Sequence, residues 1–226
     1  MKITISEEVK KLCPQVCLGL LRYQADVQPA GLALNAEFAQ AVQTAARNLK
    51  IEEVASQAHV KSTRAAYRAL GFDPTARRNS AESLLRRAVR GLEFYSVSNV
   101  VDTGNLFSLL TGYSDGSYDV TQLQGNVELR RAPAGTHYVG IGKSEMNIAS
   151  LPVLFDDLGP FGNPSSDSRR AMIQPGPREI LTVVYAFDGK DALAPCLDQF
   201  AALLTTFCAA KSITKENAGE KTKPNA

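Results

Sequence analysis

The segment Ser98–Asp119, SNVVDTGNLFSLLTGYSDGSYD, constrains the fold more than any other part of this sequence. Its apolar residues recur at helical spacing from Val100 to Leu110, which predicts a helix that ends near Gly112. Asp102 stands where an N-cap would start this helix, and Asn105 follows three residues later on the same face. The segment therefore predicts a buried helix whose first turn presents a carboxylate and a carboxamide to a cavity, unless Asp102 serves only as a cap.

Strand-like and helix-like patterns alternate in the remaining sequence, which predicts a mixed α/β (α+β) fold with β-sheets flanked by helices. We expect strands at residues 2–5, 16–27, 118–120, 127–131, 137–141 and 179–187, the middle three as a meander. We expect helices at residues 7–12, 35–58 and 190–210, and two short ones between 59 and 90. The helix at residues 35–58 could break near Lys50. Residues 211–226 are charged and nearly free of large apolar side chains, which predicts a disordered tail.

Positive charge gathers in one stretch, although the whole chain of 226 residues has a formal net charge of only +2. Residues 59–90 hold eight lysines and arginines against two acidic residues. Such a stretch is either a solvated surface that binds nothing or a face that contacts nucleic acid phosphates. The candidate RNA-binding residues are Arg64, Arg68, Arg77, Arg78, Arg86, Arg87 and, on a later strand where it could also pair with a carboxylate, Arg130.

Metal and cofactor chemistry find little support in the composition. The chain has two histidines, His59 and His137, and four scattered cysteines that we expect to be buried free thiols. We therefore predict no metal, no cofactor and no Ser-His-Asp triad. No segment approaches the length of an apolar membrane span, and the N-terminal residues do not resemble a signal peptide, so we expect a cytoplasmic protein without a membrane partner.

Four motifs occur in order along the chain, namely AYRALGFDP, RRNSAESLLRRAVRG, NVVDTGNLFSLLTG and GSYDVTQLQGNVELRRAPAG. Together they resemble the B3/B4 domain, the editing module in the β subunit of bacterial phenylalanyl-tRNA synthetase, and its free-standing relatives. The resemblance covers most of residues 64–188. It implies one B3/B4-like domain over residues 1–210, with residues 59–189 as the best-matching core and residues 1–58 as an extension packed on it.

The resemblance also implies a central pocket and its residues. The family pattern V-V-D-x-T-N appears here as VVDTGN, so Asp102 and Asn105 match as catalytic candidates while Gly104 replaces a threonine. Gly116 stands where the synthetase pattern has a histidine, and Tyr185 falls near the position of a glutamate. The predicted substrate pocket consists of Gly104, Gly116, Tyr118, Asp119, Ser165, Ser166, Asp167 and Tyr185.

Several of these residues have ordinary structural alternatives. Tyr118 could be a core residue and Asp119 a turn former, and the loop GPFGNPSSDSRR at residues 159–170 could bind an anion through its amides or satisfy them with its own side chains.

The resemblance implies a trans-acting deacylase that hydrolyses the ester of mischarged tRNA, with the aminoacylated acceptor end as its partner. An aminoacyl ester is already activated, so its hydrolysis needs a positioned water and a stabilised oxyanion more than a strong nucleophile. Asn105 could orient that water, and Asp102 or Asp167 could bind the α-ammonium group. The alternatives are a non-catalytic tRNA- or amino-acid-binding module and a small-metabolite pocket. The oligomeric state stays open.

Overall fold

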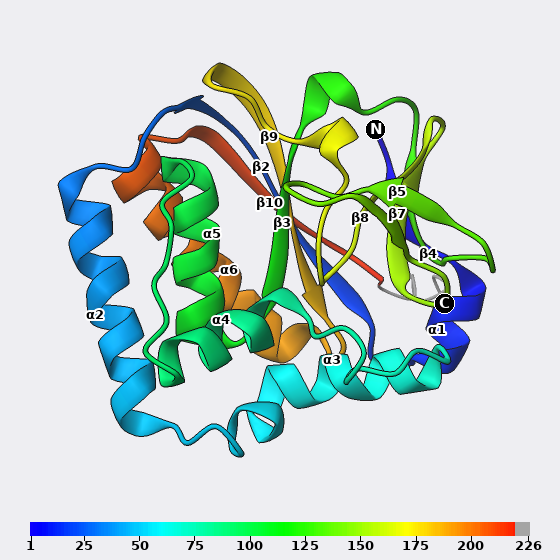
Figure 1. Ribbon diagram of the computed structural model, residues 1–226. Helices are drawn as coiled ribbons and strands as arrows, with labels where there is room; N and C mark the ends of the chain where they lie inside the picture. Colours follow the sequence, from blue (N-terminus) through cyan, green and yellow to red (C-terminus); the bar gives the residue numbers. More distant parts are fainter. Residues whose placement is uncertain (220–226) are drawn as a thin grey trace.

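The computed structural model describes residues 1–219 (Figure 1). Its helices are α1 (Glu7–Leu12), α2 (Leu32–Asn48), α3 (Ala58–Ala69), α4 (Ser80–Val89), α5 (Asn99–Thr111) and α6 (Lys190–Cys208). Its strands are β1 (Ile3–Ile5), β2 (Cys17–Val27), β3 (Ser114–Asp119), β4 (Val127–Arg131), β5 (His137–Val139), β6 (Glu145–Asn147), β7 (Pro152–Asp156), β8 (Gly159–Gly162), β9 (Gly176–Ala186) and β10 (Lys211–Ala218). Short 3-10 turns lie at Val54–Ser56, Val120–Gln122 and Arg169–Ala171. Among these described helices, none combines the length and apolar character that crossing a membrane requires.

A central antiparallel sheet in the order β10-β2-β9-β3 organises the molecule, as the predicted strands at 16–27 and 179–187 suggested. Strands β2 and β9 pair over their full lengths, from Cys17 opposite Ala186 to Val27 opposite Gly176. One face of this sheet packs on the second sheet, and the other packs on α5 and α6 (Figure 1). Because both faces are buried over residues 17–21 of β2 and 180–186 of β9, these parts read as nearly continuous apolar runs, whereas the rest of β2 alternates exposed polar with buried residues.

The second sheet has the order β1-β4-β7-β8, and β5 pairs with β6 alone. The first pair, β1 with β4, is parallel and the others are antiparallel. The predicted meander of consecutive strands is therefore wrong. Strand β3 joins the central sheet beside β9, whereas β4 joins the second sheet, and the 3-10 turn Val120–Gln122 carries the chain between them. Local alternation cannot reveal which sheet completes a strand's hydrogen bonds.

The helical layer places α5 against α2, α4 and α6. Ser98 caps α5, since its hydroxyl accepts the Val101 backbone N–H, so the alternative reading of Asp102 as the N-cap is wrong. Gly112 ends the helix in the left-handed region (φ 82°), as its position predicted. The long helix expected at residues 35–58 is interrupted, because α2 ends at Asn48 and α3 begins at Ala58.

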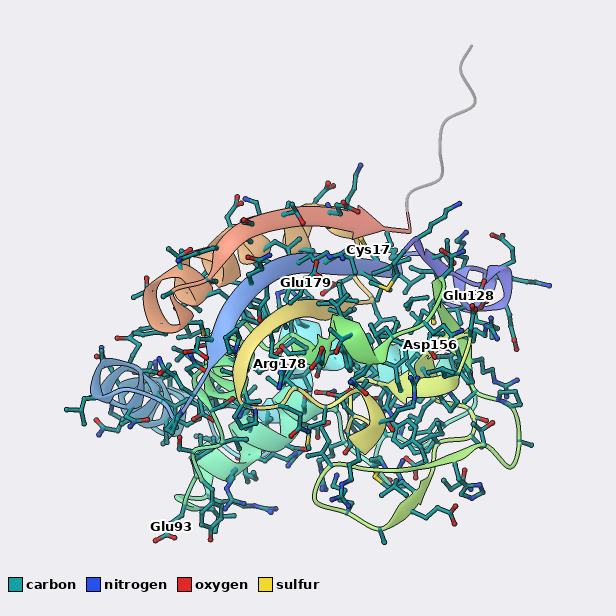
Figure 2. The ribbon with its side chains drawn as sticks, turned by 90° about the horizontal axis from the view of Figure 1, so that it is seen from above. Cys17, Glu93, Glu128, Asp156, Arg178 and Glu179 are labelled. Atoms are coloured by element: carbon teal, nitrogen blue, oxygen red, sulfur yellow. The ribbon has the colours of Figure 1, made fainter. Side chains whose placement is uncertain are left out.

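Both ends of the chain contribute strands to the central sheet. Strand β10 pairs with β2, so the prediction of a disordered tail is wrong for Lys211–Ala218, and residues 220–226 lie outside the described residues. Seen from above, β10, β2 and β9 curve side by side (Figure 2). The packed extension expected at residues 1–58 includes β2, which lies inside the sheet between β10 and β9. A polar strand at a sheet edge gains backbone hydrogen bonds that apolar patterning does not reveal.

Candidate functional site

Two carboxyl groups lie around Gly116 at the edge of the central sheet. Strand β3 has β9 on one side, and Asp115 follows Ser114 along it. The Ser108 hydroxyl of α5 donates to Oδ1 of Asp115 over 3.0 Å. From the loop after β8, Asp167 accepts the Tyr118 hydroxyl at Oδ1 over 2.7 Å. These side-chain hydrogen bonds thus go to Oδ1 of each carboxyl group, and both aspartates are half-buried.

Glycines create the space that this arrangement needs. A Cβ at Gly116 would lie 2.2 Å from the Tyr118 hydroxyl oxygen and 3.0 Å from Oδ2 of Asp167. A Cβ at Gly162 would lie 2.1 Å from the same hydroxyl. A Cβ at Gly104 would lie 2.5 Å from Oδ2 of Asp115. The Tyr118 hydroxyl and the two carboxyl groups therefore occupy the volume that side chains at these positions would fill.

The predicted pocket residues Gly116, Tyr118, Asp167 and Tyr185 thus come together, whereas Gly104 of α5 packs against Asp115. The hydroxyls of Tyr118 and Tyr185 share a hydrogen bond of 2.8 Å, and both rings are buried. The alternative that Tyr118 is a core residue is confirmed, because its ring is buried and packs edge-to-face on the core side chain Phe161. Its role in a substrate pocket stays a prediction.

The loop at residues 159–170 satisfies several of its own amides. Oδ1 of Asn163 accepts the backbone N–H groups of Ser165 and Ser166, and the Ser168 hydroxyl accepts that of Arg170. Ser165 also shares a hydrogen bond of 2.7 Å with Tyr67. These contacts match the self-satisfying alternative for the loop and hold Asp167 in place within it.

Burial raises the pKa of both carboxyl groups into the neutral range. It raises the pKa of Asp115 to about 7, against the lowering effect of the Ser108 hydrogen bond. It likewise raises the pKa of Asp167 to about 7, against the hydrogen bond from Tyr118, and the charge of Asp115 raises it further. Two interacting carboxyl groups with such pKa values can accept a proton at one site and donate one at the other near neutral pH.

Unpaired polar atoms lie next to this pair, at the start of α4. Oδ1 of Asn79 accepts the Glu82 backbone N–H over 2.8 Å and the Ser114 hydroxyl over 3.2 Å, which fixes its amide. Nδ2 of Asn79 and the Ser80 hydroxyl are buried and have no hydrogen-bond partner within residues 1–219. The Asn79 amide is thus a buried donor whose hydrogen-bonding capacity the described residues do not use.

The remaining predicted polar residues lie away from the carboxyl pair or make no contact with it. Asp102 accepts the Ser96 hydroxyl over 2.6 Å and the Val97 backbone N–H over 3.1 Å, and it lines a cavity of about 500 Å³ beside α2. Asn105 is half-buried, and its side chain forms no hydrogen bond within the described part of the chain. Asp119 accepts the backbone N–H and hydroxyl of Thr121.

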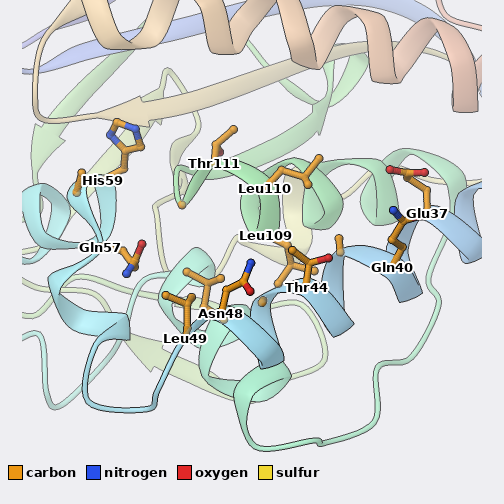
Figure 3. A pocket seen from close by; sticks show the side chains of 15 residues that line it. Glu37, Gln40, Thr44, Asn48, Leu49, Gln57, His59, Leu109, Leu110 and Thr111 are labelled. Carbon is orange, nitrogen blue, oxygen red and sulfur yellow. The ribbon is translucent and has the colours of Figure 1, made fainter.

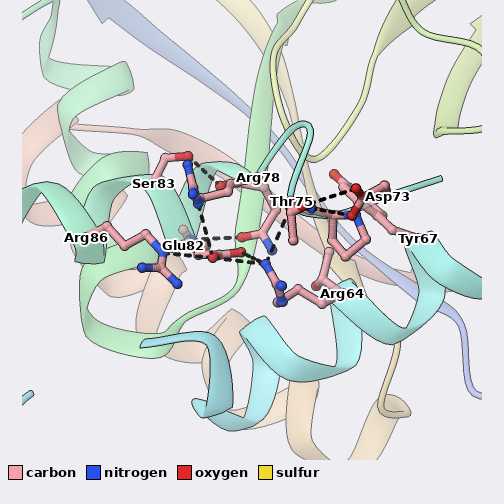
Figure 4. Close-up of polar contacts among 12 residues, drawn as sticks. Arg64, Tyr67, Asp73, Thr75, Arg78, Glu82, Ser83 and Arg86 are labelled. Carbon is pink, nitrogen blue, oxygen red and sulfur yellow. Dashed lines mark hydrogen bonds and ion pairs between the residues drawn. The ribbon is translucent and has the colours of Figure 1, made fainter. Parts of the chain in front are cut away.

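Three of the predicted RNA-binding arginines surround one buried carboxylate (Figure 4). Oε2 of Glu82 lies 2.8 Å from Nη1 of Arg64, and Oε1 lies 2.8 Å from Nε of Arg86 and 3.5 Å from Nε of Arg78. The Glu82 side chain is fully buried. Part of the positive charge in this stretch therefore balances an internal negative charge.

The other predicted arginines are spread over the surface. Arg77 donates to the backbone carbonyl of Asn147, and Arg130 pairs with Glu128. Arg68 is exposed on α3. Four arginines line a groove of about 260 Å³ on the outer face of α4, namely Arg78, Arg86, Arg87 and Arg90. This groove keeps a net positive charge, because Glu82 is the single acidic partner that Arg78 and Arg86 share within the described residues.

A further polar cluster was not predicted from the sequence. Nδ1 of His59 lies 2.5 Å from Oδ2 of Asp188, and the Tyr113 hydroxyl donates to Oδ1 of Asp188 over 3.0 Å. The rings of His59 and Tyr113 stack with their centroids 3.7 Å apart. His59 borders a cavity of about 400 Å³ between α2, the start of α3 and the end of α5 (Figure 3). Within residues 1–219, no group of three or more His, Cys, Asp or Glu side chains could hold a metal ion.

Comparison with known protein families shows the family of this chain. A family model described as the B3/4 domain matches residues 62–208. This chain belongs to the B3/4 domain family. A search of curated proteins found no match. Among solved structures, an N-terminal fragment of the phenylalanyl-tRNA synthetase β subunit from Pyrococcus horikoshii is 12% identical, with a TM-score of 0.45, and the match covers 96% of this chain and 50% of that one. This chain therefore spans about half the length of that fragment.

The matched part of this B3/4 domain contains both carboxyl groups and the arginine groove, whereas β2 and α2 precede it. Sequence reasoning found Asp167 but missed Asp115 and Asn79. A signal for Asp115 was present, because it adjoins Gly116 and shares its strand face with Ser117 rather than with the core residue Tyr118.

Proposed function

We propose that this B3/4 domain hydrolyses the ester that joins an amino acid to the 3′ end of tRNA. The observation that carries the proposal is a pair of carboxyl groups with raised pKa values beside Gly116. Asp115 lies on the α5 side of β3 and Asp167 lies against Tyr118 on the other side, and each has Oδ2 free of side-chain hydrogen bonds from the described residues. The resemblance of the sequence motifs to an editing module supports the choice of an aminoacyl ester as the substrate. No cofactor is part of this chemistry.

The two carboxyl groups divide the proton transfers between them. The ionised carboxylate takes a proton from water, whose oxygen attacks the ester carbonyl carbon to give a tetrahedral intermediate. When this intermediate collapses, the bond to the ribose oxygen breaks and the protonated carboxyl group supplies the proton that this oxygen needs. The amide of Asn79 donates to the carbonyl oxygen as negative charge develops on it. Asn105 remains a proposed second donor, and Asp102 supports the segment before α5.

The arginine groove supplies a route for the RNA. The start of α4 adjoins the carboxyl pair, because the Ser80 backbone N–H donates to Pro164 and the Ala81 backbone N–H donates to the Ser114 hydroxyl. Arg86, Arg87 and Arg90 lie toward the other end of this helix, so phosphates along the groove lead to the pair. A helix of ten residues is about 15 Å long, which a few unpaired nucleotides can follow.

A panel of mischarged tRNAs tests the proposal by measuring release of free amino acid. We expect turnover with at least one of them, a loss of about 100-fold or more in Asp115→Asn and Asp167→Asn, and little loss in Asp119→Asn, which removes a charge from the same strand. The rate should depend on pH with a midpoint near 7. No hydrolysis above background with any of these tRNAs would refute the enzymatic proposal.

Gly116 favours a second candidate, a tRNA-binding module without activity, because the resemblance places a histidine there. This module would bind tRNA with a strong salt dependence, and Asp167→Asn would not weaken that binding.

A further inference from the structure

We infer that residues 92–96 and the arginine groove of α4 form a binding site for an unpaired RNA nucleotide, with its base on Tyr95 and its phosphate in the groove. The inference takes tRNA as the partner from the proposed function. It concerns residues that lie apart from the carboxyl pair, and it does not require hydrolysis.

Arg87 joins the two halves of this site. Its guanidinium carbon lies 5.6 Å from the ring centroid of Phe94 and 5.8 Å from that of Tyr95. Its Nε donates to the backbone carbonyl of Glu93, which fixes the guanidinium plane beside the rings. We call the rings of Phe94 and Tyr95 the aromatic shelf. Because Arg87 also lines the groove on α4, its side chain contacts both the aromatic shelf and the groove.

The aromatic shelf is firm on one side and open on the other. Phe94 packs edge-to-face on Phe38 of α2, with centroids 5.2 Å apart, so residues 92–96 are anchored to the helical layer. Tyr95 is 77% exposed, so its ring is open to solvent. A base can stack on such a ring without displacing any core residue.

The cavity of about 500 Å³ behind the shelf has the composition that a nucleobase requires. Phe38, Val42 and Phe94 supply apolar walls, and the exposed amides of Asn35 and Gln43 stand at its border. Amide groups can donate to and accept from the edge of an unpaired base.

Positive charge favours a nucleic acid over a protein at the groove, whereas the acidic Glu93 and Asp102 line the neighbouring cavity. Four arginines line the groove, and a protein partner would have to bury them against acidic side chains as well as cover the exposed shelf. A single nucleotide can cover the aromatic shelf with the flat face of its base and neutralise the arginines with its phosphate.

Fluorescence anisotropy with a labelled single-stranded RNA ending in CCA tests the inference on the full chain. We expect Tyr95→Ala to weaken binding about tenfold and Tyr95→Trp to preserve it. Leu158→Ala is the matched control, since Leu158 is a 58% exposed apolar residue between β7 and β8, and it should have no effect. Arg90→Gln should reduce the slope of log affinity against log salt concentration by about 1, the value for one lost phosphate contact. Tyr95→Ala should leave this slope unchanged.

The possible results separate the alternatives. Equal RNA binding by the wild type and Tyr95→Ala would overturn the inference. A Tyr95→Ala variant that loses self-association but keeps RNA binding would also overturn it, because the aromatic shelf would then be a protein contact. Competition by AMP as strong as that by the RNA would show that a free nucleotide, not an RNA end, is the ligand. The RNA in this binding assay carries no amino acid. A failure of the deacylation assay would therefore refute the proposed function and leave the measured RNA binding unchanged.

Discussion

Replacing Glu82 by glutamine tests the arginine cluster of the helical layer directly. The substitution keeps the volume of the side chain and removes the negative charge that Arg64 and Arg86 share. Glu82 is fully buried, and the side chains of Arg64 and Arg86 are only 11% and 18% exposed, so water cannot replace the lost partner. Breaking a buried ion pair in this way costs about 3–5 kcal/mol of the free energy of unfolding.

Urea unfolding followed by far-ultraviolet circular dichroism measures this cost. Circular dichroism is the suitable signal because the chain has no tryptophan whose fluorescence could report unfolding. With an m-value of about 3 kcal/mol/M, the expected loss lowers the midpoint by about 1–1.7 M. Thermal unfolding should show a melting temperature lower by about 6–20 °C, given about 2–4 °C per kcal/mol for a chain of this size.

Glu179→Gln is the matched control. Glu179 pairs with Arg22 over 2.7 Å on β9 and β2, but the two side chains are 41% and 44% exposed, so its loss should cost less than about 1 kcal/mol. Combining Glu82→Gln with Arg64→Met should restore part of the stability, because it removes one of the stranded charges. Equal midpoints for Glu82→Gln and Glu179→Gln would show that the buried cluster is not what stabilises this layer.

Three further predictions concern the glycine and the carboxyl groups. Gly116→Ala places a Cβ 2.2 Å from a tyrosine hydroxyl oxygen and should cost about 1–3 kcal/mol in urea titrations, whereas Gly31→Ala, with no atom within 4 Å, should change stability by less than about 0.5 kcal/mol. Because burial raises the pKa of Asp115 to about 7, the folded chain keeps a proton that the unfolded chain releases at about pH 4, so stability falls as the pH rises between these values. Asp115→Asn should make that fall shallower in melting temperatures measured from pH 4 to 8, and an unchanged slope would contradict the assignment. Burial raises the pKa of Asp188, but the hydrogen bond and the charge of His59 together with the Tyr113 hydrogen bond outweigh it, so the pKa is lowered overall. The ionised carboxylate therefore stabilises the fold above about pH 4, and this stabilisation is lost as the pH falls. Asp188→Asn should therefore lower the free energy of unfolding by about 1–3 kcal/mol at pH 7 in thermal scans, and an unchanged melting temperature would contradict this role.

Strong local patterns predicted the parts of the fold that bury apolar surface. The runs at residues 16–27 and 179–187 are β2 and β9, and the amphipathic pattern at 190–210 is α6. The helix predicted at residues 7–12 is α1, and Ser6 caps it through a local contact with the Val9 backbone N–H. These elements agree because burial and local geometry favour the same structure.

Long-range pairing decided the elements that the sequence did not predict. Strand β10 is mostly exposed and polar, and it is stabilised by its hydrogen bonds to β2, which comes from the opposite end of the chain. In the same way, Asp115 and Asp167 come from different segments, and the hydroxyls that hold them belong to α5 and β3. Neither spacing nor composition reports which distant segments meet.

The glycine at position 116 shows why an absent motif residue does not settle function. A histidine there would have an ordinary pKa of about 6.5 and could transfer protons near neutral pH. In this chain the Tyr118 hydroxyl fills the space of a side chain at 116 and donates to Asp167, whose pKa burial raises to about 7. In the proposed mechanism, one of the two proton-transfer groups therefore lies on the neighbouring loop instead of at position 116, and its pKa is still near neutral. A histidine restored at position 116 would clash with Tyr118, so the glycine and the Tyr118–Asp167 pair must be understood as one unit.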